Sequence, residues 1–188
     1  MSDTSRLNFI ALLPPDDICD RVTAFKQEIA SRYDSRKALN SPPHVTLQPP
    51  FEWEPSEADA LDTVLSEFAA YQAPVPIALE GFGAFPPKVL FVHVEKTPDL
   101  LAIQPELYDT LKERLGITAR NRYPTFEPHV TIALRDLSIS AFDRAWPQFR
   151  DRPFSAEFVV PKLTRLEHDG TRWQVAAQFE FSLTEFDE

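Results

Sequence analysis

The chain has 188 residues, 43% of them apolar and 26% charged, which is typical of a globular protein and excludes a wholly disordered chain. Its formal net charge of −10 argues against broad attraction to a nucleic-acid backbone or an anionic membrane, so a nucleotide ligand would need a local basic lining. The glycines form no phosphate-binding loop, and the single cysteine, Cys19, excludes an intrachain disulfide and a cysteine-based zinc site. Because the N-terminus is polar and the apolar run at 9–13 is short, we expect no membrane span and a cytoplasmic protein.

The first third of the chain shows the periodicities of a strand, a helix, a second strand and a second helix. An apolar run at 7–13, stopped by a proline pair, predicts a buried strand. Residues 42–51 predict a short strand, and Ser56 is expected to cap the second helix. The first helix, which Asp16 or Asp17 caps, has an apolar stripe at spacings of three and four residues: Ile18, Val22, Phe25, Ile29 and Tyr33.

The rest of the chain predicts further strands and helices without a linker between them. The expected strands are 75–79, 89–94, 128–134, 154–166 and 172–181, the last two joined by a turn at Asp169–Gly170. The expected helices are 98–115, which Pro105 kinks or restarts, and 141–149. Because no Gly/Ser-rich segment divides the chain, we expect a single α+β domain over residues 1–188.

One pentapeptide occurs twice in nearly the same form. Pro-His-Val-Thr-Leu spans 43–47 and Pro-His-Val-Thr-Ile spans 128–132, each on an expected strand. We expect the apolar faces of these strands to pack under helices and the polar faces to line a cleft. Strand alternation gives these polar faces the following residues: His44, Thr46 and Gln48 on the first strand, and His129, Thr131, Ala133 and Arg135 on the second.

Two imidazoles and two hydroxyls that meet across a cleft suit phosphodiester chemistry. A neutral histidine can take a proton from the attacking water or hydroxyl, while a protonated histidine gives one to the leaving oxygen. Each threonine lies two residues along its strand, roughly 7 Å by strand rise, so its hydroxyl can hold a phosphate oxygen. This chemistry requires neither a metal nor another cofactor. A single His-x-Thr is a weak signal, and it is the duplication that favours a catalytic role over a structural one.

These motifs resemble those of the 2H phosphoesterase superfamily, and the chain is most similar to its 2′-5′ RNA ligase or RNA 2′,3′-cyclic phosphodiesterase branch. The segments RLNFIALLP, GAFPPKVLFVHV and FEPHVTIALRD resemble parts of that family, so the resemblance covers nearly the whole chain. It implies two pseudo-symmetric lobes, each an antiparallel sheet flanked by helices, around a central cleft. It also implies a catalytic tetrad of His44, Thr46, His129 and Thr131, with His129 as the general base and His44 as the general acid.

The substrate side departs from the family pattern. The family's arginine falls five residues after the second motif histidine, where this chain has Leu134 followed by Arg135. Strand alternation would keep Arg135 on the His129 face, where its charge would disfavour an imidazolium and so help to keep His129 a base. Other candidates for binding substrate are Lys88, Gln48, Tyr123 and Arg122.

We therefore expect a monomeric, metal-independent phosphodiesterase without a membrane partner, which acts on a 2′,3′-cyclic phosphate or 2′-5′ linkage in a small nucleotide or RNA end. A different class remains open, namely a non-catalytic nucleotide-binding module with the same fold, which a turnover assay would separate. A zinc hydrolase using His44 and His129 is the third alternative, and it would have to recruit Asp136 or Glu127 as a further ligand.

Overall fold

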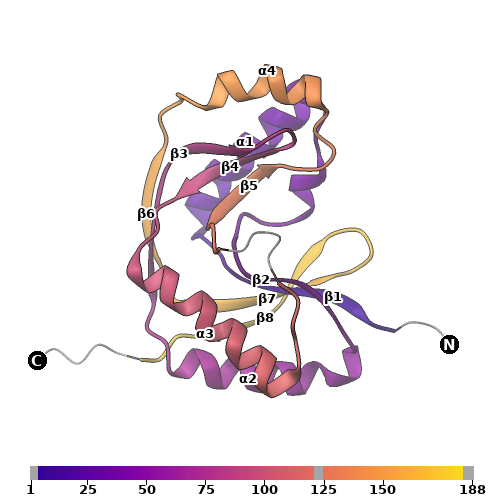
Figure 1. Cartoon of the computed structure of the whole chain (residues 1–188), viewed down its shortest axis with the longest axis vertical. Coiled ribbons are helices and arrows are strands. Elements are labelled where there is room, and N and C mark those ends of the chain that lie inside the picture. The colour runs from indigo at the N-terminus through magenta and orange to yellow at the C-terminus, as the bar shows by residue number, and fades with distance from the viewer. Residues whose placement is uncertain (1–3, 121–124, 184–188) are drawn as a thin grey trace, which may run out of the picture.

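Two four-stranded antiparallel sheets form the frame of the protein, in a computed structural model that describes residues 4–120 and 125–183 (Figure 1). The first sheet has the order β2-β1-β7-β8 and the second β5-β4-β3-β6. The strands of the first sheet are β1 (Arg6–Leu12), β2 (Val45–Trp53), β7 (Lys162–His168) and β8 (Trp173–Glu180). Those of the second are β3 (Val75–Phe85), β4 (Val89–Val94), β5 (His129–Ala133) and β6 (Ser155–Val160).

Four α-helices flank the sheets, two on each. In the first lobe, α2 (Ala58–Ala70) contacts β7 and β8, and α3 (Pro98–Leu115) contacts β2. In the second lobe, α1 (Asp16–Tyr33) contacts β5 and also α4 (Ile139–Phe149), which lies beside it at the top of Figure 1. The expected α+β class, with two lobes of antiparallel sheet and helix, is confirmed.

The two lobes contain a repeated unit whose helices are exchanged. The units β1-α1-β2 and β4-α3-β5 each join two paired antiparallel strands through an 18-residue helix. Each helix ends at a residue in the left-handed conformation, Asp34 with φ 54° and Gly116 with φ 68°. Because α1 packs on β5 and α3 packs on β2, the helix of each unit supports the motif strand of the other.

The motif strands β2 and β5 are edge strands of their sheets, and they contact each other. Each has a register shift at the same distance from its histidine. From Thr46 to Gln48, β2 takes two residues while its partner β1 takes only one. From Thr131 to Ala133, β5 likewise takes two residues while its partner β4 takes one. An extra residue of this kind is a β-bulge, which turns the following side chains to the other face of the strand. Strand alternation therefore holds from histidine to threonine and breaks immediately after.

The predicted strand over 154–166 is wrong, because it is two strands in different sheets. β6 belongs to the second sheet and β7 to the first, and Pro161 separates them. Proline lacks the N–H that a continuous ladder needs, so the chain breaks there and crosses between the lobes.

Two predicted details of the helices also differ. Ser56 does not cap the second helix, because it lies in a 3₁₀ turn, η2 (Pro55–Glu57), and α2 begins after it. Helix α3 continues through Pro105. The carbonyl that Pro105 cannot bond belongs to Leu101, and that residue is 40% exposed, so water can satisfy it.

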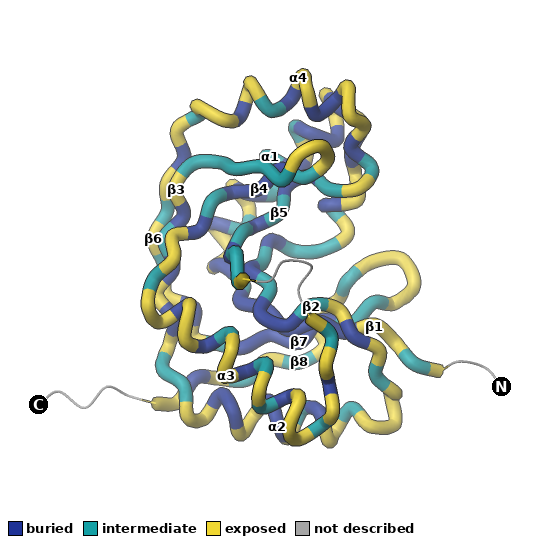
Figure 2. The backbone as a smooth tube through the Cα atoms, viewed as in Figure 1, coloured by how far each residue is buried: buried dark blue, intermediate teal, exposed yellow. Residues whose placement is uncertain are grey.

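A continuous core of buried residues includes side chains from both sheets and all four α-helices. Figure 2 shows the buried positions along the faces where helices and sheets meet, with exposed positions on the outer surface. Val45 and Leu47 of the first motif and Val130 and Ile132 of the second belong to this core. The apolar residues of the motifs thus fix the position of the polar residues between them. Within the described residues, no helix combines the length and apolar character needed to cross a membrane.

Candidate active site

The two His-x-Thr motifs occupy equivalent positions at the edges where the sheets meet. His44 directly precedes β2, and His129 is the first residue of β5. In both motifs the histidine and threonine are partly exposed, while the residues between and after them are buried. The structure thus brings together the strands that carry all four members of the predicted tetrad, since β2 and β5 are in contact.

Each histidine is anchored by the same short-range hydrogen bond. Nδ1 of His44 lies 2.7 Å from the carbonyl oxygen of Pro42, and Nδ1 of His129 lies 2.7 Å from that of Glu127. A carbonyl oxygen can only accept, so Nδ1 carries the proton in both rings and Nε2 of the neutral ring keeps its lone pair. Neither Nε2 has a hydrogen-bond partner among the described residues. Both rings are therefore oriented with a free nitrogen that can accept or donate a proton.

Aromatic side chains form the walls beside both imidazoles. The centroid of the Phe9 ring lies 4.7 Å from that of the His44 ring. The centroids of the Phe85 and Phe91 rings lie 5.1 Å and 5.2 Å from that of the His129 ring. The Phe91 ring lies over Gly83 of the neighbouring strand, where a Cβ atom would come within 2.3 Å of it. Glycine at this position is thus required for the wall beside His129.

The surroundings lower the pKa of both imidazoles. Burial by the aromatic walls is the main cause, because it disfavours the charged form even though part of each ring remains accessible. The pKa of His44 falls to about 4, with further lowering by the charges of Lys26 and His129, against a smaller rise from the Pro42 carbonyl. For His129 the lowering of the pKa is opposed by the carbonyl and the carboxylate of Glu127. The Lys26 cation thus lowers the pKa of the His44 imidazole, while the Glu127 anion raises that of the His129 imidazole.

The threonines follow their histidines on the same face of each strand. Thr46 and Thr131 are partly exposed, and among the described residues neither hydroxyl has a hydrogen-bond partner. A hydroxyl can rotate to donate to an anionic oxygen. The arrangement can therefore supply two proton-transfer groups and two hydrogen-bond donors to one phosphate.

Two of the predicted substrate residues lie elsewhere than strand alternation indicates. Gln48 is completely buried, and its Nε2 donates to the carbonyl oxygen of Ala119 at 2.7 Å, so it does not lie on the exposed face where strand alternation placed it. The bulge after Thr46 turns it inward. Arg135 is exposed but lies beyond the end of β5 and after the second bulge, so alternation no longer places it beside His129.

Of the three other candidates for binding substrate, the structure describes only Lys88. Lys88 is exposed in the turn between β3 and β4, where its backbone N–H donates to the carbonyl of Phe85, whose ring faces His129. It is therefore close in the chain to the site, and its role stays a prediction. Arg122 and Tyr123 lie outside the described residues.

Sequence reasoning missed two residues near the motifs. Lys26 is buried, although it could have been found, because it continues the apolar stripe of the first helix four residues after Val22. His93 lies directly opposite His129 in the pairing of β4 with β5, and its Nε2 lies 3.6 Å from Glu95. Only the strand register, which no local pattern gives, could have placed His93 there.

The carboxylates that a zinc site would recruit are engaged elsewhere. Asp136 accepts hydrogen bonds from the Ser35 hydroxyl at 2.8 Å and from two backbone N–H groups, those of Arg36 and Lys37. Glu127 forms an ion pair with Lys96 at 2.7 Å. Over residues 4–120 and 125–183, no group of three or more His, Cys, Asp or Glu side chains could hold a metal ion. Both carboxylates thus already have partners of their own within the protein.

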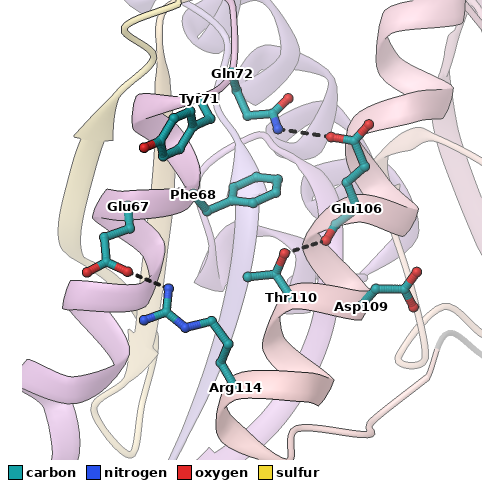
Figure 3. Close-up of a pocket in the computed structure, with 8 residues that line it drawn as sticks. All are labelled: Glu67, Phe68, Tyr71, Gln72, Glu106, Asp109, Thr110 and Arg114. Carbon is teal, nitrogen blue, oxygen red and sulfur yellow. Dashed lines mark hydrogen bonds and ion pairs between the residues drawn. The ribbon is translucent and has the colours of Figure 1, made fainter.

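A separate pocket of about 720 Å³ lies between α2 and α3, and Figure 3 shows the side chains that line it. Within it Glu67 forms an ion pair with Arg114, and Gln72 donates to Glu106. No motif residue lines it. This pocket is therefore not the place where the motifs act.

Comparison with known proteins matches residues 14–172 to the model of the 2′-5′ RNA ligase superfamily. A protein of Bacillus mycoides (strain KBAB4) named "Putative phosphoesterase" is 32% identical over 175 residues, which cover 90% of this chain and 94% of that protein. TT0787 of Thermus thermophilus has the same fold, with a TM-score of 0.71, 21% identity and coverage of 94% of this chain and 98% of that one. E. coli LigT complexed with 3′-AMP gives a TM-score of 0.70 at 18% identity, covering 95% and 99%. The resemblance drawn from the motifs is confirmed, and this chain belongs to the 2′-5′ RNA ligase superfamily of 2H phosphoesterases.

Proposed function

We propose that this protein is a phosphodiesterase that hydrolyses a 2′,3′-cyclic phosphate or a 2′-5′ linkage in a small nucleotide or RNA end. The observation that carries the proposal is the matched pair of imidazoles on contacting edge strands. In both, Nδ1 is held by a backbone carbonyl and Nε2 is free of partners among the described residues. Such a pair suits general acid–base catalysis, in which one ring is neutral and the other protonated.

The reaction proceeds by attack of water on the phosphorus of the cyclic phosphate. One Nε2 takes a proton from the water as the new P–O bond forms, and the other Nε2–H gives its proton to the ribose oxygen that leaves. The product is a phosphate monoester with a free ribose hydroxyl, and the two imidazoles have exchanged protonation states. Thr46 and Thr131 donate hydrogen bonds to the non-bridging oxygens, where negative charge increases in the transition state.

The charges around the rings favour His44 as the base and His129 as the acid. Lys26 disfavours the imidazolium form of His44, while the Glu127 carboxylate favours that of His129. This division is the reverse of the one that the family resemblance implies. The physical support expected for the other assignment depended on Arg135, which lies beyond the strand that carries His129.

The relatives support a nucleotide as the class of substrate. Solved structures of E. coli LigT are complexes with 3′-AMP, ATP and NADP+. Those ligands share a ribose and a phosphate, which are the groups that the proposed reaction needs. A net charge of −10 makes local cations such as Lys88 and Arg135 the candidates for holding the substrate phosphate.

The test is a turnover assay on 2′,3′-cyclic nucleotides and 2′-5′ dinucleotides with excess EDTA present. We expect hydrolysis by the unaltered protein and a loss of about 10²–10⁴-fold in His44→Asn and His129→Asn. Asparagine can still donate to the backbone carbonyl but lacks the Nε2 atom, so it separates anchoring from proton transfer. Binding without turnover would favour a nucleotide-binding module, and loss of turnover on chelation with rescue by zinc would favour a metal hydrolase.

A further inference from the structure

Lys26 is a buried lysine whose ammonium holds the loop that leads into the first motif. Only 2% of the residue is exposed. Its Nζ donates to the carbonyl oxygens of Ala38 and Ser41, both at 2.9 Å. Ala38 lies in η1 (Lys37–Asn40), a 3₁₀ turn between α1 and β2. Burying a charge is costly unless it is paired or hydrogen-bonded, so a lysine kept here in place of an apolar residue points to a specific use.

The carbonyls that Lys26 holds are adjacent in the chain to the one that orients His44. Ser41 accepts from Lys26, and the next carbonyl, that of Pro42, accepts from Nδ1 of His44. A displacement of this loop would therefore move the acceptor that sets the ring orientation. A pocket of about 300 Å³ borders the same loop and is lined by Lys26 together with Arg172 and Trp173 of the β7–β8 hairpin.

Within residues 4–120 and 125–183, the second motif has no buried cation in the equivalent place. Lys26 and Tyr108 are both eleventh in their 18-residue helices, α1 and α3. The Tyr108 hydroxyl donates to the carbonyl oxygen of Thr118 at a distance of 3.5 Å, in the loop that leads toward His129. That contact is longer, and the cation that donates to the same hydroxyl, Arg120 at 2.9 Å, is exposed. The two nearly identical motifs therefore differ in the buried charge behind the loop that supports the histidine.

We propose that Lys26 is a positioning residue that, through the Ala38 and Ser41 carbonyls, holds the loop whose Pro42 carbonyl orients His44 and places a buried positive charge behind that loop, which prepares His44 for the base role. This inference deepens the proposed function and rests on it only for the name of that role. The charged groups that act on His44 are Lys26 and His129, and the titratable group that acts on Lys26 is Cys19. Arg172 lines the pocket that borders Lys26.

The charge and the hydrogen bonds of Lys26 have separable effects. Burial lowers the pKa of Lys26 to about 8, so it is charged throughout the range in which His44 titrates. The ammonium therefore opposes protonation of His44, as a nearby like charge does. An uncharged side chain that still donates would hold the loop without that opposition.

Two substitutions of Lys26 separate these effects, with a third variant as control. Lys26→Met removes both the charge and the donors, and Lys26→Gln removes the charge but keeps an N–H group. Lys37→Met removes the same charge from an exposed position in the same loop, where only the backbone N–H of Lys37 bonds to Asp136. Titration of the imidazole signals by NMR gives the pKa of each histidine, and amide hydrogen exchange reports the order of residues 38–41.

We expect the pKa of His44 to rise in both Lys26 variants while staying below its ordinary value, because burial remains, and to stay unchanged in Lys37→Met. The pKa of His129 should change less than that of His44. Exchange at 38–41 should accelerate in Lys26→Met and less in Lys26→Gln. On a turned-over substrate, kcat of Lys26→Met should fall roughly ten- to a hundredfold with a smaller change in KM.

The proposal is overturned if His44 titrates as before in a folded Lys26 variant, or if Lys37→Met shifts it equally. If Lys26→Met fails to fold, the same comparison holds for Lys26→Gln. The titration and exchange measurements need no substrate, so their failure is distinguishable from failure of the proposed phosphodiesterase activity.

Discussion

The two motif histidines are anchored alike but have different electrostatic surroundings. Each donates Nδ1–H to the carbonyl two residues before it, which leaves both Nε2 atoms equivalent in orientation. The difference comes from Lys26, which is distant in sequence and acts on His44, and from Glu127, two residues before His129, which acts on that ring. At the scale of the residue, two nearly identical motifs thus have different charges beside their imidazoles.

This difference predicts which variant an activated leaving group will rescue. A leaving group that departs without protonation makes the general acid dispensable, while the base is still needed. With a nucleoside phosphodiester of nitrophenol as substrate, His129→Asn should recover most of its activity and His44→Asn should not. The reverse result, measured as kcat/KM relative to the unaltered protein, would assign His129 as the base and keep the two-histidine mechanism.

The threonine hydroxyls are expected to contribute less than the imidazoles. Thr46→Ala and Thr131→Ala each remove one hydrogen bond to a charged oxygen, which is worth ~1.5–3 kcal/mol of transition-state stabilisation. Thr→Ser at either position should recover most of the lost kcat/KM, since serine keeps the hydroxyl. Serine variants as impaired as the alanine variants would mean that the methyl group, and hence packing, explains the threonine.

At the scale of the element, matched β-bulges decide which motif side chains face a substrate. Both bulges follow the threonine and turn the next residues inward, so that Gln48 and Ala133 are buried. The wall beside His129 depends in the same way on backbone geometry, because the Phe91 ring occupies the space left by Gly83.

Gly83→Ala should therefore disturb His129 from the neighbouring strand. The new Cβ would lie 2.3 Å from the Phe91 ring, so this ring, which packs beside His129, would have to shift. Overpacking of this kind costs typically ~1–3 kcal/mol of stability, measurable by urea unfolding, and we expect kcat/KM to fall as well. In a Phe91→Leu background the same substitution should cost much less, and equal costs in both backgrounds would exclude the clash as the cause.

At the scale of the whole molecule, the partly buried motif histidines link stability to pH. Their pKa values are lower in the folded than in the unfolded chain, so below about pH 6.5 the unfolded chain binds more protons. The free energy of unfolding should consequently decrease as the pH falls from about 6.5 to about 4. The lowered pKa values of Glu28 and Asp136 extend this loss to more acidic pH.

Urea unfolding at a series of pH values between 7 and 4 tests this dependence. The double variant His44→Gln/His129→Gln should show a flatter dependence than the unaltered protein above about pH 5. His168→Gln, which leaves both motif imidazoles in place, serves as the control and should keep the slope. An unchanged slope in the double variant would mean that other groups account for the loss of stability in acid.

Features that depend on neighbouring residues in the chain could be predicted from the sequence. The apolar stripe of α1, the strand β4 at 89–94 and the two His-x-Thr motifs are local patterns, and the structure has each of these elements in the expected place. The family could be predicted from the duplicated motif, because the His-x-Thr spacing places an imidazole and a hydroxyl on the same face of a strand. The physical reason is that helical and strand periodicities come directly from backbone geometry.

Tertiary structure alone decided the surroundings of those motifs. The bulge that buries Gln48 follows from the pairing of β2 with β1, and the exchange of α1 and α3 between lobes brings Lys26 behind the loop that leads to His44. Pairing register, burial and the charge near an imidazole depend on residues distant in sequence, which local periodicity does not specify. The sequence by itself thus determined the reacting groups, while the fold determined their acidity and which neighbours a substrate can reach.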